Sequence, residues 1–318
     1  MLAYLLRRTA ILAGSLFGAA VALFVLLRLL PGDPANALLP VGATDEQIEA
    51  ARRELGTDAP LLSQFTAWLH DVATLDLGKS LVSTLPVGPE IAGRLPVTIP
   101  LTLAAFTLAV LIAVPVGVLA AARADRWYGP VINAIAQLGI AVPAFWVGLL
   151  LVTLFALNLR LLPAGGFPPD GWADPGAAVE SLILPVVTIA LVMSASLIRY
   201  VRAATLDVLN ADYLRTARAL GAGPVEAFAR HGVRNAAIPV IAVLAMELAT
   251  TFLGAVVVES VFALPGLGGM LVRGISQHDY PVIQGIMLVS TATVLLVGFL
   301  GDLAQRLVDP RLTHRATS

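Results

Sequence analysis

The sequence contains no cysteine and has few charged residues. Of its 318 residues, 13% are charged and 58% are hydrophobic, and the mean hydropathy is +0.86. Soluble domains carry about 25% charged residues, so this chain has too little polar surface to coat a soluble globule. The lack of cysteine excludes disulfides, zinc–thiolate sites and a cysteine nucleophile. The composition therefore indicates a membrane protein and argues against a soluble enzyme.

Other chemistry-bearing residues are also scarce. The net charge of −1 gives no overall basic surface for nucleic acid. The histidines show no metal-ligand spacing; they are His70, His231, His278 and His314. We therefore expect no catalytic centre, no bound metal and no nucleic-acid partner.

Six uncharged or nearly uncharged runs approach the ~20 apolar residues that a membrane-spanning helix needs. They are Ala10–Leu27, Leu95–Ala122, Trp127–Leu159, Ser181–Ile198, Ile238–Val258 and Tyr280–Gly301. The first exceeds the ~7–15 apolar residues of a signal peptide, so we expect a retained helix. The third is longer than a membrane requires, so part of it should lie outside or at the interface. The prediction is an all-α polytopic membrane protein with six transmembrane helices.

The distribution of arginine predicts the orientation of these helices. Arginines cluster in the segments 123–126 and 199–234, and the positive-inside rule assigns such segments to the cytoplasm. Both termini are then cytoplasmic. The predicted organisation is residues 1–30 for the N-terminus and first helix, 31–94 outside, 95–306 as the membrane core in contact with lipid, and 307–318 as a tail.

The outside segment is too long and polar for a simple loop. A capping box at Thr44–Gln47 predicts one short helix, and the apolar spacing after Pro60 predicts another over residues 61–69. These helices either pack on the membrane domain or form a docking surface for a partner. Gly78-Lys79-Ser80 looks like the end of a phosphate-binding loop, but Ala73 stands where that loop requires glycine. We expect no nucleotide site in this chain.

The cytoplasmic segment Ala204–Asn235 predicts a helical hairpin. Tyr213, Ala217 and Leu220 fall on one helical stripe. Gly221 and the pair Gly223-Pro224 break that helix, and a second helix from about Pro224 returns to the membrane. The hairpin either enters a groove on another protein or lies against lipid headgroups.

This hairpin resembles the EAA loop of permease subunits of binding-protein-dependent ABC importers, in the form found in dipeptide and oligopeptide permeases. Gly221 matches the family's glycine, and Ala217 and Ala219 match its small residues. Further segments, in the same order along the chain, resemble the B-type subunit of the permease pair. They are residues 4–8, 27–34, 75–80, 143–148, 212–219, 230–236, 259–268, 279–285 and 309–311.

The resemblance implies a type I ABC importer permease in a bacterial inner membrane. It further implies a second homologous permease, two cytoplasmic ATPase subunits that bind ATP and Mg²⁺, and an extracytoplasmic binding protein that delivers peptides. No cofactor is then expected in this chain itself. The implied ATPase-coupling residues are Tyr213, Arg215, Ala217, Arg218, Ala219, Leu220 and Gly221. Leu220 departs from the family pattern, which usually has a lysine there.

Glu247 is an acidic residue within the fifth run, where the family leads us to expect a neutral polar residue. A charge inside a membrane is costly, so the side chain should face protein or a water-filled path. It either lines the pathway and contacts the cargo or is a neutral glutamic acid bonded to a neighbouring helix. The cargo also stays open among peptides, nickel chelates, opines and glutathione. A secondary transporter or membrane enzyme is a third possibility, disfavoured because no internal repeat or nucleophile–base pair is visible.

Overall fold

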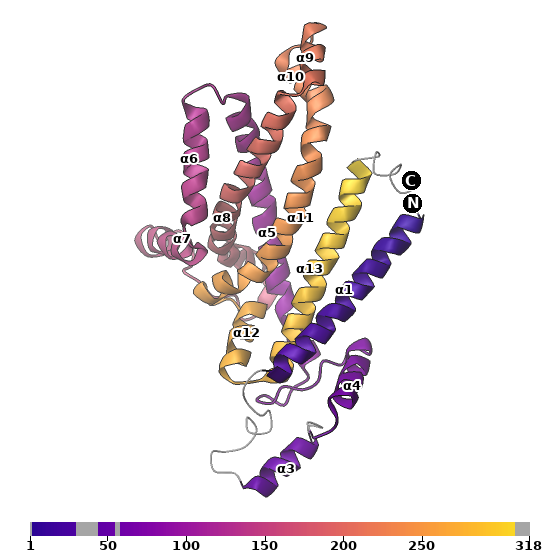
Figure 1. Cartoon of the computed structure of the whole chain (residues 1–318). Coiled ribbons are helices and arrows are strands. Elements are labelled where there is room, and N and C mark those ends of the chain that lie inside the picture. The colour runs from indigo at the N-terminus through magenta and orange to yellow at the C-terminus, as the bar shows by residue number, and fades with distance from the viewer. Residues whose placement is uncertain (1, 30–43, 55–57, 309–318) are drawn as a thin grey trace. The chain divides into compact units, whose positions relative to one another are not determined.

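The computed structural model describes residues 2–29, 44–54 and 58–308, and every structural statement below concerns these residues (Figure 1). Residues 30–43, which include parts of the 27–34 motif and of the predicted 31–94 segment, and residues 309–318, which include most of the predicted tail and the 309–311 motif, lie outside the described residues. The described chain is helical, with one isolated bridge between Lys79 and Pro86. The α-helices are α1 (Leu2–Leu29), α3 (Asp45–Glu54), α4 (Leu61–Ala73), α5 (Val87–Ala122), α6 (Tyr128–Ala141), α7 (Ala144–Leu151), α8 (Pro175–Leu209), α9 (Asp212–Ala219), α10 (Pro224–Ala227), α11 (Val233–Val261), α12 (Leu267–Ser276) and α13 (Tyr280–Val308). The all-α prediction is confirmed.

The described chain contains five helical stretches that could span a membrane, or six if one bent pair of helices is counted as a single span. Among the described residues, five helical stretches are long and apolar enough, and they lie in α1, α5, α8, the 224–252 stretch that begins at α10, and α13. A sixth span exists if α6 is taken together with α7 and the π-helical segment that follows it (Val152–Asn158). The six predicted runs are therefore all helical, and the third is not a single straight helix.

The third run breaks at Pro143, where α6 and α7 meet at 100°. Proline has no N–H to donate, and it disfavours helical geometry in the residue before it. Val142 is accordingly extended, with φ −86° and ψ 123°, and Pro143 precedes the first residue of α7. The bend divides this run into two helical stretches, and the placement of one part outside the membrane or at the interface stays a prediction.

The chain forms two compact units, which are described separately. The first unit contains residues 99–264 and 296–308, and the second contains residues 3–98 and 265–295. In the first unit, α6, α7 and α11 all pack against α8 (Figure 1). A Cβ on Gly117 of α5 would lie 2.8 Å from Val201, and one on Gly139 of α6 would lie 2.8 Å from Ala195. Small residues thus let the helices approach α8 closely, as is usual in membrane bundles.

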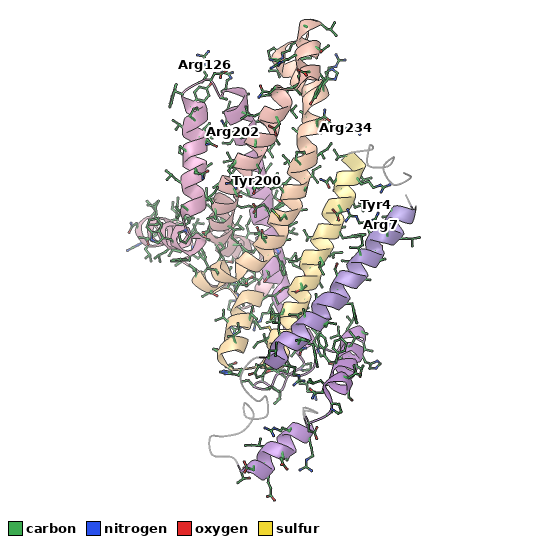
Figure 2. The ribbon with its side chains drawn as sticks, in the orientation of Figure 1. Tyr4, Arg7, Arg126, Tyr200, Arg202 and Arg234 are labelled. Carbon is green, nitrogen blue, oxygen red and sulfur yellow. The ribbon has the colours of Figure 1, made fainter. Side chains whose placement is uncertain are left out.

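One end of the first unit is arginine-rich and carries the 204–235 hairpin. Helix α8 has 35 residues, which corresponds to about 52 Å, and a bilayer core is only about 30 Å thick. Part of α8 therefore extends beyond the membrane core, and its C-terminal end leads into α9 and α10. Arg126, Arg202 and Arg234 lie toward this same end (Figure 2). Arg234 Nε donates a 2.9 Å hydrogen bond to the Val308 carbonyl, which ties the start of α11 to the end of α13.

In the second unit, aromatic rings join α4 to α1. Phe24 lies 5.2 Å from Phe65 and 5.8 Å from Trp68, measured between ring centroids. The capping box of α3 is present: Thr44 N–H donates to Gln47 Oε1 at 2.9 Å, and Gln47 N–H donates to Thr44 Oγ1 at 3.4 Å. Both short helices predicted between residues 31 and 94 are thus confirmed. The aromatic contacts show that α4 packs onto a membrane helix.

The beginnings of α5 and α13 also meet in the second unit. A Cβ on Gly285 would lie 2.9 Å from Val87 and 3.1 Å from Ile91, so glycine allows these two helices to touch. Val87 is fully buried and Ile91 nearly so. This contact packs the start of α5 against α13.

Candidate functional sites

The 204–235 hairpin has a small hydrophobic core of its own. Leu214 of α9 is 1% exposed and clusters with Val208, Ala227 and Ala236. Ala217 packs against this cluster. The hairpin is therefore a folded element that keeps its shape through apolar contacts among α8, α9, α10 and α11. The predicted helix and its return are confirmed, and Leu214 is the anchor that the predicted stripe of Tyr213, Ala217 and Leu220 missed.

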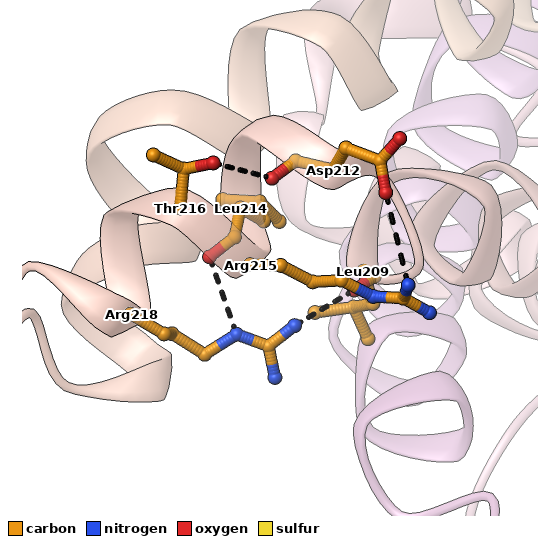
Figure 3. A network of polar contacts seen from close by, with 6 residues as sticks. All are labelled: Leu209, Asp212, Leu214, Arg215, Thr216 and Arg218. Atoms are coloured by element: carbon orange, nitrogen blue, oxygen red, sulfur yellow. Dashed lines mark hydrogen bonds and ion pairs between the residues drawn. The ribbon is translucent and has the colours of Figure 1, made fainter.

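Arg218 fastens α9 to the end of α8 (Figure 3). Its Nη2 donates to the Leu209 carbonyl at 3.1 Å, and its Nε donates to the Leu214 carbonyl at 3.3 Å. The last carbonyls of a helix have no partner within the helix, and a cation there is favourable. Arg215 makes only a 3.7 Å ion pair with Asp212, and both side chains are largely exposed. Arg218 thus has an internal role in the hairpin, whereas Arg215 faces solvent.

Gly221 ends α9 in a left-handed turn with φ +97°. Its N–H donates to the Arg218 carbonyl at 3.0 Å, and the Ala222 N–H donates to the Ala217 carbonyl at 3.2 Å. These two bonds are those of a Schellman C-cap, which requires a left-handed residue and favours glycine. The turn predicted at Gly221 is present, and its backbone geometry explains why glycine occupies it.

Large apolar side chains project from the tip of the hairpin. Leu220 is 84% exposed and Val225 is 82% exposed. Ala219 and Gly221, which flank Leu220 in the sequence, are also exposed. The hairpin thus combines a rigid base with an exposed apolar tip that the rest of the described chain leaves open.

Glu247 of α11 faces α8 within the first unit. Ser196 Oγ donates a 2.9 Å hydrogen bond to Glu247 Oε1. Glu247 also lines a cleft of about 230 Å³, together with Ser196, Thr250 and Thr251 and with apolar residues of α6, α7 and α8. The side chain thus bonds to a neighbouring helix and borders an open space, and its contact with the cargo stays a prediction.

A third site joins two segments that the sequence presents far apart. Ser80 Oγ donates a 2.5 Å hydrogen bond to Asp279 Oδ2, and the Leu81 N–H donates to Oδ1 at 3.1 Å. Ser80 lies in a tight turn in which its N–H donates to the Leu85 carbonyl. A phosphate-binding loop instead connects a strand to a helix, so Gly78-Lys79-Ser80 does not have that geometry. Spacing along the chain contained no signal for the contact with Asp279.

These features define a helical membrane subunit with a folded hairpin at its arginine-rich end. Residues 113–314 match the family described as binding-protein-dependent transport system inner membrane component. Residues 1–102 match the N-terminal part of the membrane component of such systems. The chain belongs to this family of ABC transporter permeases and is a multi-pass inner-membrane protein.

Two relatives align over nearly their whole length. The chain is 38% identical over 314 residues to a putative peptide transport system permease protein of Brucella abortus (strain 2308), covering 99% of this chain and 100% of the relative. It is 36% identical over 315 residues to the glutathione transport system permease protein GsiC of Escherichia coli (strain K12). This alignment covers 99% of this chain and 100% of the relative.

Solved structures show the same fold. A methionine ABC transporter, MetNI, in an inward-facing conformation superposes with a TM-score of 0.58 at 18% identity, covering 69% of this chain and 96% of that chain. An amino acid ABC transporter structure superposes with a TM-score of 0.54 at 18% identity, covering 69% of this chain and 94% of that chain. The architecture is that of a type I ABC importer permease.

Proposed function

We propose that this chain is one of two permease subunits that together line the pathway of an ATP-driven importer of peptides. The two relatives named for peptide and for glutathione transport support this cargo class, since glutathione is itself a tripeptide. Partner ATPase subunits then bind ATP and Mg²⁺, and an extracytoplasmic protein delivers the cargo. The arginine-rich end of the first unit is cytoplasmic in this proposal, in accord with the positive-inside rule.

The exposed tip of the hairpin is the observation that carries the proposal. If ATP is hydrolysed in another subunit, the conformational change must reach this chain through a physical contact. Leu214 and Arg218 attach the base of the hairpin to α8 and α11. A displacement of the tip would therefore also move these two helices. Leu220 and Val225 offer an apolar surface for a groove in the ATPase, and Arg215 can pair with acidic residues there. Exposed apolar patches commonly mark such contacts.

Glu247 belongs to the pathway in this proposal. The cleft beside it contains hydroxyl groups of Ser196, Thr250 and Thr251, which can bind polar groups of a peptide backbone. The carboxylate can pair with the amino terminus of the cargo. Its hydrogen bond to Ser196 holds the carboxylate in place and does not occupy all its acceptor sites.

The proposal is tested by placing a charge on the hairpin tip. Leu220→Asp should leave the subunit folded and inserted, because the side chain contacts nothing that stabilises the hairpin. It should abolish co-purification with the cognate ATPase subunits and peptide-stimulated ATP hydrolysis in proteoliposomes. A carboxylate in an apolar groove without a partner is strongly unfavourable.

The matched control is Leu161→Asp, the same change at an exposed leucine outside the hairpin. Leu161 is 64% exposed and follows the π-helical segment, at the opposite end of the predicted topology. This variant should retain ATPase association. Wild-type association and uptake in Leu220→Asp would mean that the hairpin tip does not couple the subunits.

A further inference from the structure

The second unit contains a charged cleft of about 470 Å³, between the start of α5, α12 and the turn that precedes α5. Its volume lies within the ~300–1,000 Å³ that is usual for small-molecule sites. In the proposed orientation it opens toward the outside. Neither the family description nor the relatives' names assign a function to it.

Two arginines from different helices line this cleft. Arg94 comes from α5 and Arg273 from α12. The Arg94 Nη1 donates a long hydrogen bond of 3.5 Å to the Pro265 carbonyl. Within the described residues, no carboxylate pairs with either guanidinium. Both cations thus have donor capacity available to a ligand.

The acidic residues of the cleft differ in what they already bind. Asp279 is 3% exposed and accepts hydrogen bonds from the Ser80 hydroxyl and the Leu81 N–H, so it serves as a structural support. Glu90 is half-buried and accepts one hydrogen bond, from the Ser83 hydroxyl at 3.1 Å. The charges left for a ligand are therefore two positive and one negative.

The cleft is held in shape by bonds between its walls. The Leu267 N–H at the start of α12 donates to Thr98 Oγ1 of α5 at 3.0 Å. Ser80 and Asp279 join the turn to the beginning of α13. A site whose walls are fixed in this way loses little entropy when a ligand binds.

We propose that this cleft binds the carboxylate of a small zwitterionic peptide through Arg94 and Arg273, with Glu90 pairing with its amino group. Guanidinium groups suit this role because they bind carboxylates in a bidentate manner. The cleft is a receiving site for cargo at the outer end of the permease. This inference rests on the proposed function and adds a substrate contact to it.

Thiol labelling tests the proposal, because the chain has no native cysteine. Gln277 lines the cleft and is exposed. In the reconstituted transporter, Gln277→Cys should react with an impermeant maleimide, and dialanine should slow this reaction. At subsaturating concentrations, protection should require about tenfold more dialanine amide than dialanine, which corresponds to the loss of a charge-assisted contact.

Arg273→Gln in the Gln277→Cys background should reduce the preference for the free carboxylate, because only Arg94 then remains to bind it. Lys79→Gln is the charge-matched control, because Lys79 is exposed on the same turn and does not line the cleft. It should keep the preference. Equal protection by dialanine and its amide, or none by either, would overturn the proposal.

Labelling is carried out without the binding protein, because a docked binding protein would shield position 277 whether or not the cleft binds peptide. These labelling outcomes do not decide whether the proposed function is correct. If the transporter imports peptides with normal ATP coupling but peptide gives no protection at position 277, the peptide site in the cleft is refuted and the proposed function is not. Failure of the chain to associate with ATPases and to import peptides refutes the proposed function.

Discussion

Ser80 and Asp279 lie 199 positions apart in the chain and share a buried hydrogen bond of 2.5 Å. Ser80 is 4% exposed and Asp279 is 3% exposed. The same Ser80 oxygen accepts hydrogen bonds from the N–H groups of Val82 and Ser83. One hydroxyl thus organises the turn before α5 and connects it to the start of α13.

Ser80→Ala should destabilise this region by about 1–3 kcal/mol, because it leaves a buried carboxylate oxygen and two N–H groups with fewer partners. Thermal unfolding of the purified protein in detergent measures the effect. Asp76→Ala is the comparison, because Asp76 accepts an exposed hydrogen bond from the Gly78 N–H, and its loss should cost less. Equal loss of thermal stability in the two variants would show that the buried hydrogen bond stabilises the protein no more than the exposed one.

Single cysteines should report the topology. Ser83, Ala173 and Asp212 are all exposed, so differences in labelling reflect the side of the membrane. Ser83→Cys and Ala173→Cys should react with an impermeant reagent added to intact cells, and Asp212→Cys should react only after permeabilisation. Thr317→Cys should behave like Asp212→Cys, although residue 317 lies outside the described structure. Labelling of position 212 in intact cells would reverse the proposed orientation.

Gly221→Val should weaken coupling through the backbone. A β-branched residue at φ +97° is strained by about 1–3 kcal/mol, so the Schellman turn should open and displace the tip. The expected result is a subunit that inserts and pairs with its sister permease but loses peptide-stimulated ATP hydrolysis. Gly223→Val is the control, because Gly223 has φ −63° and a Cβ added there would have no other atom within 4 Å. Equal activity of the two variants would exclude the turn as the cause.

Ala217 and Ala219 are two positions apart and differ in what they contact. Ala217 packs on the hairpin core and Ala219 is exposed. Ala217→Glu should place a charge in that core and accelerate proteolysis of the isolated subunit's hairpin. Ala219→Glu should leave proteolysis unchanged and reduce ATPase association. Identical proteolysis of both variants would contradict the inward placement of Ala217.

Glu247→Gln should preserve stability, because a glutamine oxygen can still accept the hydrogen bond from Ser196. It should reduce the preference for peptides with a free amino terminus over N-acetylated peptides. Uptake of both peptide types by proteoliposomes, with the same binding protein throughout, gives this ratio. Ser196→Ala, which keeps the carboxylate but removes the hydrogen bond that positions it, should reduce the preference less than Glu247→Gln does. An unchanged ratio in Glu247→Gln would remove Glu247 from the pathway.

The hairpin shows how far spacing alone predicts a site. The helix at Asp212–Ala219, the turn at Gly221 and the restart at Pro224 follow local rules of glycine and proline, and the structure contains all three. Which face of α9 is buried does not follow from those rules. Leu214 and Tyr213 are neighbouring large side chains, and the positions of α8, α10 and α11 decide that Leu214 is enclosed.

By itself, the sequence determined that this is an all-helical membrane protein, where its long apolar helical segments lie, and to which family it belongs. Those properties depend on apolar run length, on arginine placement and on local residue patterns. The tertiary structure alone decided that Arg218 caps α8, that Ser196 meets Glu247 and that Ser80 meets Asp279. Such pairings depend on how separate helices pack, because a side chain can be matched to a distant partner only when the backbone brings the two within hydrogen-bond distance.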